Sequence, residues 1–201
     1  MRGALELIDR YGFGIALQTK SCDVLRDMDL LRRINDKTKA VVQMTLTCWD
    51  DDLCRIVEPH VSVTSERFEA LKRFRDAGIP PVVWLCPLLP FINDTEENLT
   101  GILGMCAEAQ VQGVINFGMG LTLRSGNREY YYRQLDRHFP GLKEEYIRRY
   151  QNAYEVPSPD SDKLLRLFHQ ICHETGMMHD NEQIFEYMHR CEDTQQLRFL
   201  K

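Results

Sequence analysis

Residues 39–47 read KAVVQMTLT, an apolar run that is rich in β-branched side chains and is typical of a buried strand. Three further runs of this kind occur before residue 120, at 13–18, 81–86 and 114–117. Segments with apolar residues at helical spacing alternate with them, at 4–11, 23–34, 64–77 and 94–110. Glycine or proline ends most of these segments, so the first part of the chain alternates between strand and helix.

This alternation predicts an α/β fold with a parallel sheet, because continuous apolar strands joined by helices are typical of sheets that are covered on both faces. About four strand–helix units are expected, either as a doubly wound sheet or as part of a parallel (β/α) barrel. A short helical segment is also expected at 50–57. In both arrangements a functional site belongs at the carboxyl ends of the strands.

The residues at the helix starts predict N-caps, and the pattern in the second half of the chain predicts further helices. Thr64 or Ser65 is the predicted N-cap of one helix, and Asn93 or Asp94 that of the next. From about residue 127 the strand pattern disappears, and four helices are expected, at 127–137, 141–152, 160–175 and 182–190. The best linker candidate is the Pro-Ser-Pro segment at 157–159. We therefore expect a region of strand–helix units over 1–126, either doubly wound or part of a barrel, and a helical region packed on it over 127–201.

Composition excludes several classes of protein. The 201 residues include 25 Lys and Arg against 30 Asp and Glu, a formal net charge of −5, so a basic footprint over the whole chain is missing. No apolar run approaches the roughly 20 residues of a membrane span. The seven cysteines are scattered and odd in number, which favours reduced thiols in a cytoplasmic protein and excludes a compact CxxC metal motif.

Polar residues follow each predicted strand: Lys20 after the first, Thr45 and Thr47 on the second, Asn93 after the third and Gly118 after the fourth. A cation, hydroxyl groups, an amide and a glycine that meet at one edge suit an anionic, polar small molecule. The alternative is that they are ordinary turn and cap residues. Charged clusters such as Arg148-Arg149 are interpreted as solvated helix faces.

Other patterns point to no specific chemistry. Gly118-x-Gly120 lacks a third spaced glycine and follows the last strand, so a dinucleotide-binding fingerprint is not indicated. No Walker-type loop and no GxSxG elbow occurs. His169 and His173 face the same way on one helix and, with His179, could bind a transition metal, although packing or surface roles are the simpler interpretation.

Four blocks of sequence, in this order and spacing, resemble a known family: FGIALQTKS at 13–21, VVQMTLT at 41–47, PPVVWLCPLLPFINDTEEN at 80–98 and GVINFGMGLTLRSGNREYYY at 113–132. They are similar to the spore photoproduct lyase-like branch, of the DNA-repair-lyase type, of the radical S-adenosylmethionine proteins. The resemblance runs from about Ala4 to His189. It implies a partial (β/α) barrel that binds S-adenosylmethionine together with a [4Fe–4S] cluster held by a CxxxCxxC loop.

This chain contains no CxxxCxxC. The resemblance therefore implies that its four strands are the third to sixth of the family barrel, and that it is a C-terminal portion that lacks the cluster loop. Alone it is expected to bind no cluster and to be inactive, unless an N-terminal segment complements it. The missing strands would leave the strand at 13–18 at an open edge. A truncated gene model, a split gene and a deliberate fragment remain open.

The resemblance also assigns residues. Lys20 matches the position that reaches the methionyl carboxylate, Thr45 a hydroxyl position near the same group or the ribose, and Arg67 a basic position that faces the carboxylate. Asn93 and Gly118 match positions near the adenine and the substrate. Glu58 and Pro59 match a block that is expected to be structural.

The leading hypothesis is thus that the chain is part of a radical S-adenosylmethionine enzyme. The candidate activity is that of a lyase on damaged DNA, and no residue of this chain is expected to be a metal ligand. Cys48, Cys86 and the tyrosines at 130–132 are the conceivable hydrogen donors or relays, although a core role for Cys86 is the simpler interpretation. One alternative is a non-catalytic module that binds a nucleoside-like ligand or acts as a scaffold. Another is an unrelated barrel enzyme. The substrate and any nucleic-acid partner cannot be read from the residues.

Overall fold

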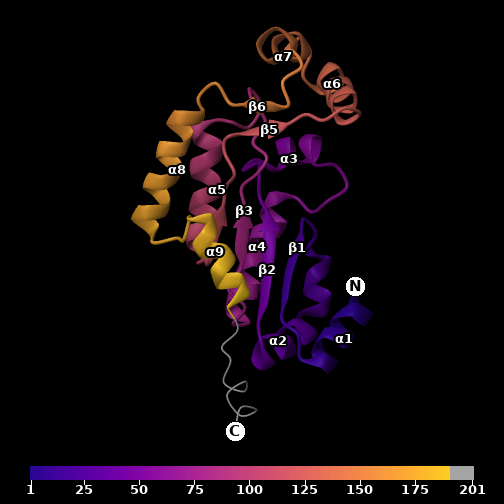
Figure 1. Cartoon of the computed structure of the whole chain (residues 1–201), viewed down its shortest axis with the longest axis vertical. Helices are drawn as coiled ribbons and strands as arrows, with labels where there is room; N and C mark the ends of the chain where they lie inside the picture. The colour runs from indigo at the N-terminus through magenta and orange to yellow at the C-terminus, as the bar shows by residue number, and fades with distance from the viewer. Residues whose placement is uncertain (191–201) are drawn as a thin grey trace.

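A computed structural model of the chain describes residues 1–190 and shows a parallel sheet that alternates with helices (Figure 1). The sheet has four strands in the order β1-β2-β3-β4, each parallel to the next. The strands are β1 (Ile15–Thr19), β2 (Ala40–Thr45), β3 (Val82–Trp84) and β4 (Gly113–Ile115). The predicted α/β fold is confirmed, and each strand lies within or close to its predicted run.

The helices follow the predicted segments. They are α1 (Arg2–Tyr11), the 3₁₀ turn η1 (Cys22–Asp27), α2 (Met28–Lys37), α3 (Asp51–Val57), α4 (Thr64–Asp76), α5 (Glu96–Glu108), α6 (Asn127–His138), α7 (Leu142–Tyr150), α8 (Ser161–Thr175) and α9 (Asn181–His189). The segment predicted as one helix over 23–34 is instead a 3₁₀ turn that leads into α2. None of the helices between residues 1 and 190 combines the length and the apolar character needed to cross a membrane.

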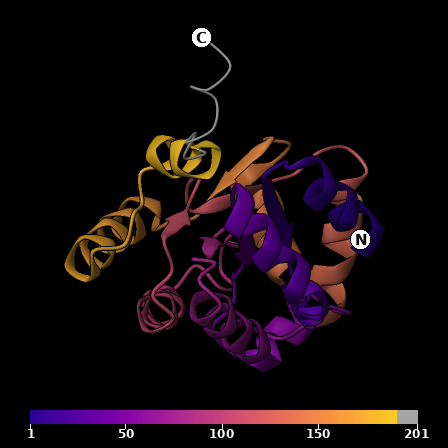
Figure 2. The same cartoon turned by 90° about the horizontal axis from the view of Figure 1, so that it is seen from below.

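Both faces of the sheet are covered from β2 to β4, which explains why these strands are apolar on successive residues, whereas Ala16 and Gln18 of the edge strand β1 are exposed. On β2, Ala40, Val42 and Met44 lie in the main core with residues of α2, α4 and α5. Val41 points to the other face, where it belongs to a smaller apolar cluster with Ile184 of α9. Figure 2 shows α9 on the opposite side of the sheet from α4 and α5.

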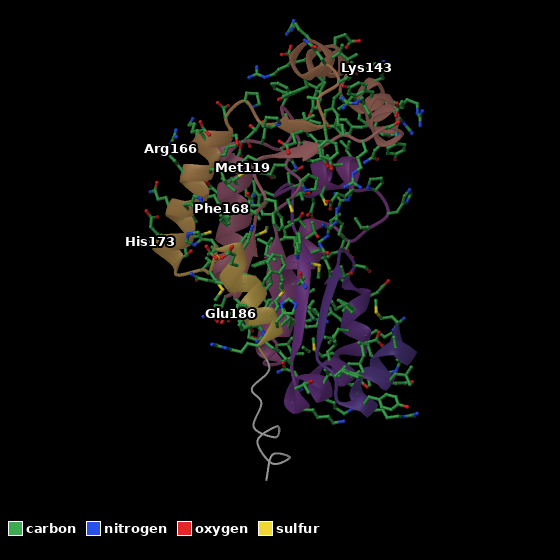
Figure 3. The ribbon with its side chains drawn as sticks, viewed as in Figure 1. Met119, Lys143, Arg166, Phe168, His173 and Glu186 are labelled. Atoms are coloured by element: carbon green, nitrogen blue, oxygen red, sulfur yellow. The ribbon has the colours of Figure 1, made fainter. Side chains whose placement is uncertain are left out.

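The helix α8 covers α5 and not the sheet. Phe168 is buried in the main core, whereas Arg166 and His173 lie on the outer side of α8 (Figure 3). The predicted division of the chain after residue 126 stays a prediction, and the described contacts run across it. The helix α8 packs on α5, and α9 on the sheet.

The sequence pattern did not predict one pair of strands. The strands β5 (Gly120–Thr122) and β6 (Glu155–Pro157) form an antiparallel pair. Each has three residues, too few for an alternating pattern to show. A Cβ on Gly120 would lie 2.5 Å from the carbonyl oxygen of Val156, so only glycine permits this pairing. Of the proposed linker at 157–159, Pro157 ends β6 and Ser158 is buried, whereas the side chains of Pro157 and Pro159 are exposed.

These strands frame a small unit with its own apolar core. We call residues 120–157, which comprise β5, α6, α7 and β6, the cap. Its buried side chains are Leu123, Leu135, Tyr146, Tyr150 and Val156. In Figure 1 the cap lies at the top of the molecule, beyond the carboxyl ends of the sheet strands.

Two predicted N-caps are wrong. Thr64 is the first helical residue of α4, and its hydroxyl donates to the carbonyl of Cys48 at 2.5 Å. Thr95 caps α5 by accepting from the N–H of Asn98, since the Asn93 side chain is already bonded elsewhere. In both cases a tertiary hydrogen bond takes the side chain that a local cap needs.

Gly101 of α5 makes room for an indole ring. A Cβ at this position would lie 2.3 Å from Cγ of Trp49, whereas at Gly104 of the same helix nothing lies within 4 Å. We expect Gly101→Ala to push Trp49 off α5 and to lower the free energy of unfolding by about 1–3 kcal/mol. Gly104→Ala, the matched control, is expected to raise it by about 0.5–1 kcal/mol. Urea denaturation followed by tryptophan fluorescence measures both, and equal effects would contradict this packing.

Candidate functional site

A cavity of about 530 Å³ opens at the carboxyl ends of the strands, beneath the cap. One side, which we call the strand-end wall, is formed by Lys20 after β1, Thr47 after β2 and Glu58 after α3. The opposite side, the cap wall, is formed by Leu121, Leu123, Tyr130 and Tyr131. The strand-end wall therefore brings two charged groups and a hydroxyl to the cavity, beside apolar residues such as Val57 and Leu89, and the cap wall is mainly apolar.

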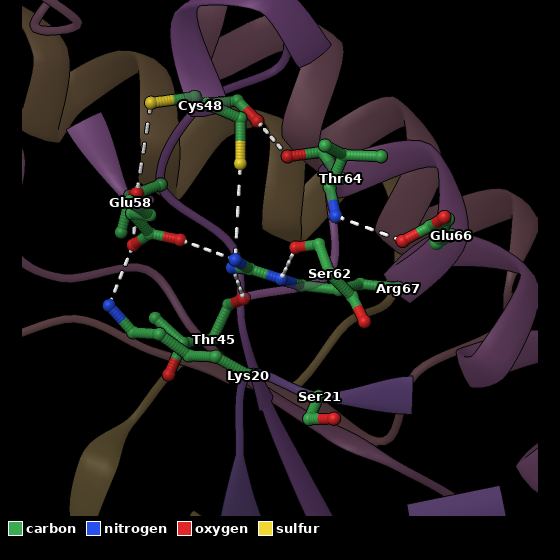
Figure 4. A network of polar contacts seen from close by, with 12 residues as sticks. Lys20, Ser21, Thr45, Cys48, Glu58, Ser62, Thr64, Glu66 and Arg67 are labelled. Atoms are coloured by element: carbon green, nitrogen blue, oxygen red, sulfur yellow. Dashed lines mark hydrogen bonds and ion pairs between the residues drawn. The ribbon is translucent and has the colours of Figure 1, made fainter. Parts of the chain in front are cut away.

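Three charged side chains meet behind and within the strand-end wall (Figure 4). The Nζ of Lys20 donates to Oε1 of Glu58 at 2.7 Å, and a terminal nitrogen of Arg67 lies 2.6 Å from Oε2. Their exposure differs sharply: the side chain of Lys20 is 38% exposed, that of Glu58 7% and that of Arg67 0%. Lys20 is thus the member of this group that a ligand can reach.

Arg67 is held by more than its ion pair. Its Nε donates to the carbonyl of Ser62 at 2.7 Å, and another nitrogen donates to the carbonyl of Thr45 at 2.8 Å. Thr45 lies at the end of β2, and Ser62 in the loop before α4. The buried guanidinium therefore ties the end of β2 to the start of α4, and its planar set of donors suits such a junction.

Glu58 stays ionised in this setting. Burial alone raises the pKa of its carboxyl group, but the hydrogen bond from Lys20 and the charges of Lys20 and Arg67 outweigh it, so the pKa lies below its ordinary value. The hydroxyl of Thr47 also donates to Oε1 at 3.0 Å. The carboxylate is thus shared by two cations and one hydroxyl group.

Asn93 supports the same wall from behind. Its amide nitrogen donates to the carbonyl of Thr47 at 2.8 Å, and its oxygen accepts from the N–H of Leu89 at 2.5 Å. Asn98 of α5 donates to the same carbonyl of Thr47 at 2.9 Å. These amides fix the backbone that carries the hydroxyl of Thr47, without reaching the cavity themselves.

Gly118 lies on the cavity rim with a φ of 108°, a conformation that favours glycine. Its N–H donates to the side chain of Asn116 at 2.7 Å, and Asn116 in turn donates to the carbonyl of Leu85 at 3.0 Å. The turn after β4 is therefore set by one asparagine. This turn lets Gly118 and Gly120 line the cavity.

Of the five residues that the resemblance assigned, the structure places two on the cavity. Lys20 and Gly118 line it, whereas Thr45, Arg67 and Asn93 are buried behind the strand-end wall. Their assigned roles stay predictions. From sequence alone Glu58 is expected to be structural, yet it lines the cavity. No local pattern could have shown this, because its partner Lys20 lies 38 residues away.

The conceivable relay residues divide in the same way. Cys86 and Tyr131 line the cavity, whereas Cys48 is buried. Burial raises the pKa of the Cys48 thiol to about 11 and raises that of Cys86 as well, so both are protonated near neutral pH. The hydroxyl of Tyr131 shares a hydrogen bond of 2.9 Å with that of Tyr146, and burial raises its pKa.

Within residues 1–190, no three His, Cys, Asp or Glu side chains come together in a way that could hold a metal ion. The rings of His169 and His179 contact each other at a tilt of 56° with centroids 5.2 Å apart, and Phe168 contacts both. These histidines therefore have a packing role in the described structure. Cys191, the seventh cysteine, lies outside the described residues.

No protein-family model matches the chain. Among curated proteins, uncharacterized protein Rv2578c of Mycobacterium tuberculosis strain H37Rv is 29% identical over 166 residues, which are 83% of this chain and 48% of the relative. Uncharacterized protein MJ0683 of Methanocaldococcus jannaschii is 30% identical over 95 residues, 47% of this chain and 35% of the relative. The chain thus spans about half of the length of the first relative.

One solved structure shares the fold. A domain of pyruvate-formate lyase-activating enzyme from Bacteroides vulgatus superposes with a TM-score of 0.57 over 89% of this chain and 86% of that domain, at 13% identity. The predicted partial parallel barrel with a helical C-terminal region is thereby confirmed as the fold class. At this level of identity the likeness concerns the fold alone.

The buried guanidinium gives a test of the site's architecture. We expect Arg67→Met to lower the free energy of unfolding by about 3–5 kcal/mol, because Glu58 and two carbonyl groups lose a buried partner. Arg55→Met is the control, since Arg55 forms an exposed ion pair with Asp52 whose loss costs about 0–1 kcal/mol. Urea denaturation compares the two variants. Equal stability losses would show that Arg67 does not hold the wall together.

Proposed function

We propose that the chain is the C-terminal portion of a radical S-adenosylmethionine enzyme of the spore photoproduct lyase-like branch. Its part in that enzyme is to hold the carboxylate and the nucleoside of S-adenosylmethionine. The four sequence blocks support this assignment, and so does a fold shared with a domain of pyruvate-formate lyase-activating enzyme. The radical chemistry of such an enzyme, hydrogen abstraction by a carbon-centred radical, is what bound S-adenosylmethionine supplies.

The observation that carries the proposal is the position of Lys20. Its ammonium group is partly exposed on the strand-end wall of a cavity of about 530 Å³, at the edge where parallel α/β folds bind ligands. A carboxylate beside a lysine gains a charge-assisted hydrogen bond. Lys20 is therefore placed to receive the methionyl carboxylate.

The remaining walls suit a nucleoside. The backbone of Gly118 and Gly120 lines the cavity and permits close approach of a ring or ribose. Leu121, Leu123 and Tyr131 of the cap wall exclude water from that side. In this proposal Thr45, Arg67 and Asn93 act from behind, by fixing the backbone and the carboxylate that position Lys20 and Thr47.

The described residues do not fit a [4Fe–4S] cluster. Such a cluster needs three neighbouring thiolates, whereas the six cysteines among residues 1–190 are separate, and Cys48, Cys54, Cys106 and Cys172 are buried. We therefore assign the cluster to a complementing N-terminal segment. The open side of β1, which pairs only with β2 in the described sheet, is where another strand would add.

Ligand binding tests this proposal without the cluster. We expect S-adenosylhomocysteine to bind the chain, and Lys20→Gln to weaken that binding about 10- to 100-fold, the value of one charge-assisted hydrogen bond. Methylthioadenosine, which has no carboxylate, should bind both variants alike. Lys163→Gln is the control, since Lys163 also pairs with a glutamate but lies outside the cavity. Calorimetric titration measures each affinity, and equal losses for the two ligands would contradict the assignment.

A second observation favours a nucleic-acid substrate, the finer part of the family assignment. Four arginines of the cap lie over aromatic rings at 6.0 Å: Arg124 over Tyr154, Arg128 over Tyr132, Arg133 over Tyr130 and Arg149 over Phe91. In the part of the chain that the structure describes, none of these four pairs with a carboxylate. Arg128 is held by backbone carbonyls of the cap and its ring Tyr132 is half-buried, so Arg124, Arg133 and Arg149 are the arginines that a ligand can reach. Arginines interleaved with exposed rings are typical of surfaces that bind single-stranded nucleic acid.

From sequence alone the cluster Arg148-Arg149, which includes one of these arginines, is interpreted as a solvated helix face, so this surface needs its own test. Fluorescence anisotropy with a short oligothymidylate should show binding that weakens with salt. For Arg124→Gln/Arg133→Gln we expect the slope of log affinity against log salt to fall by about 0.7 for each phosphate that the variant no longer neutralises. Arg166→Gln, on the outer side of α8, should leave the slope unchanged. Binding by the wild type that is independent of salt would reject nucleic acid as a partner.

A further inference from the structure

The charges around the strand-end wall do not balance. Lys20 and Arg67 carry two positive charges, and Glu58 supplies the carboxylate that pairs with both. Among residues 1–190 no other carboxylate forms an ion pair with either cation. The neutral groups that Arg67 binds, the carbonyls of Thr45 and Ser62, do not offset its charge. One positive charge at a partly buried wall is therefore left for a ligand.

The three members differ in how freely they can move. Arg67 is fully buried and held by two carbonyls, and Glu58 is anchored by the hydroxyl of Thr47. Lys20 is the exposed member, has a flexible side chain, and is bonded to Glu58 through one oxygen. The other oxygen, Oε2, lies close to Arg67 but accepts no well-aligned hydrogen bond. Glu58 can therefore turn toward Arg67 if Lys20 leaves.

We propose that Glu58 is a placeholder for the anionic group of the ligand: it holds Lys20 while the cavity is empty, and the ligand's carboxylate takes Lys20 from it. Glu58 then remains with Arg67 and Thr47. This inference rests on the proposed function for the identity of the ligand, but not for the exchange itself. It makes Glu58 a group that competes with the ligand, where the family resemblance implied only a structural role.

The charge count also predicts which anions the wall accepts. A singly charged carboxylate brings the group of four charges to neutrality, because it adds one negative charge to two cations and Glu58. A doubly charged phosphate would leave a net negative charge beside Glu58 in a partly buried place, which is unfavourable. The wall should therefore accept a singly charged carboxylate group more readily than a doubly charged phosphate group.

The proposed exchange predicts whether a substitution of Glu58 strengthens or weakens ligand binding. We expect Glu58→Gln to bind S-adenosylhomocysteine about tenfold more tightly than the wild type, because the competing charge at Lys20 is gone. Its affinity for methylthioadenosine should not change. Glu96→Gln is the matched control, since Glu96 also pairs with a lysine but on the surface, away from the cavity. If Glu58 merely positions Lys20, Glu58→Gln weakens binding of S-adenosylhomocysteine, and an unchanged or weakened affinity overturns the proposal.

Glu58→Gln leaves Arg67 without a carboxylate, so a measurement on the wild type must accompany it. The side-chain NMR signal of Lys20, assigned by its loss in Lys20→Arg, is followed while acetate or sulfate is added. Acetate should shift the signal and abolish nuclear Overhauser contacts between Lys20 and Glu58, whereas sulfate should do so more weakly. Contacts that persist at saturation with acetate overturn the placeholder. If acetate acts as expected but S-adenosylhomocysteine does not bind, the proposed function fails and the exchange stands.

Discussion

The guanidinium of Arg67 holds together three segments that meet at one edge of the sheet. It donates to the end of β2 through the carbonyl of Thr45, and to the loop before α4 through that of Ser62. It also faces Glu58, which follows α3. A fully buried cation is costly unless each donor finds a partner. These contacts therefore explain why the backbone between β2 and α4 follows one path.

The position of Lys20 follows from that junction. Because Arg67 fixes Glu58, and Glu58 accepts from Lys20, the flexible lysine is aimed at the cavity and not at bulk solvent. The ammonium group on the strand-end wall is thus positioned by a residue that does not line the cavity. The same chain of contacts lowers the pKa of Glu58 despite its burial, which keeps the carboxylate charged and able to bind Lys20.

The sequence predicted the four sheet strands because apolar side chains follow one another along them. On β2 this reflects burial on both faces, as Val41 and Val42 show, whereas one face of β1 is exposed at Ala16 and Gln18. It did not predict β5 and β6, whose pairing depends on the missing Cβ of Gly120. The prediction of a helix N-cap at Asn93 is wrong for a related reason, because that side chain is hydrogen-bonded to a residue distant in sequence.

The site was predicted in part and for a clear reason. The rule that ligands bind at strand ends led to Lys20 and Gly118, which both line the cavity. This rule did not predict that Arg67 is buried behind the wall. An arginine is expected at the surface unless its partners are known, and those of Arg67 lie 5 and 22 residues away in the sequence. The role of Glu58 is likewise a property of the folded group and not of its local sequence.

The two walls of the cavity meet in the loop between β3 and α5. Asn93 of this loop binds the carbonyl of Thr47 and so supports the strand-end wall. Its neighbour Asp94 accepts from the hydroxyl of Ser158, the residue that follows the cap, at 2.6 Å. The carbonyl of Pro90 accepts from the hydroxyl of Tyr146 in the cap at 2.7 Å, so the same loop anchors the cap.

Burial raises the pKa of Asp94, and the hydrogen bond from Ser158 opposes that rise without cancelling it, which marks this anchor as largely closed to water. A shift of the cap would break a buried hydrogen bond and expose the carbonyl of Pro90, and each buried group left unpaired costs about 1–3 kcal/mol. The distance between the strand-end wall and the cap wall is therefore set by the loop between β3 and α5. Any ligand that spans the cavity must fit the width that this loop allows.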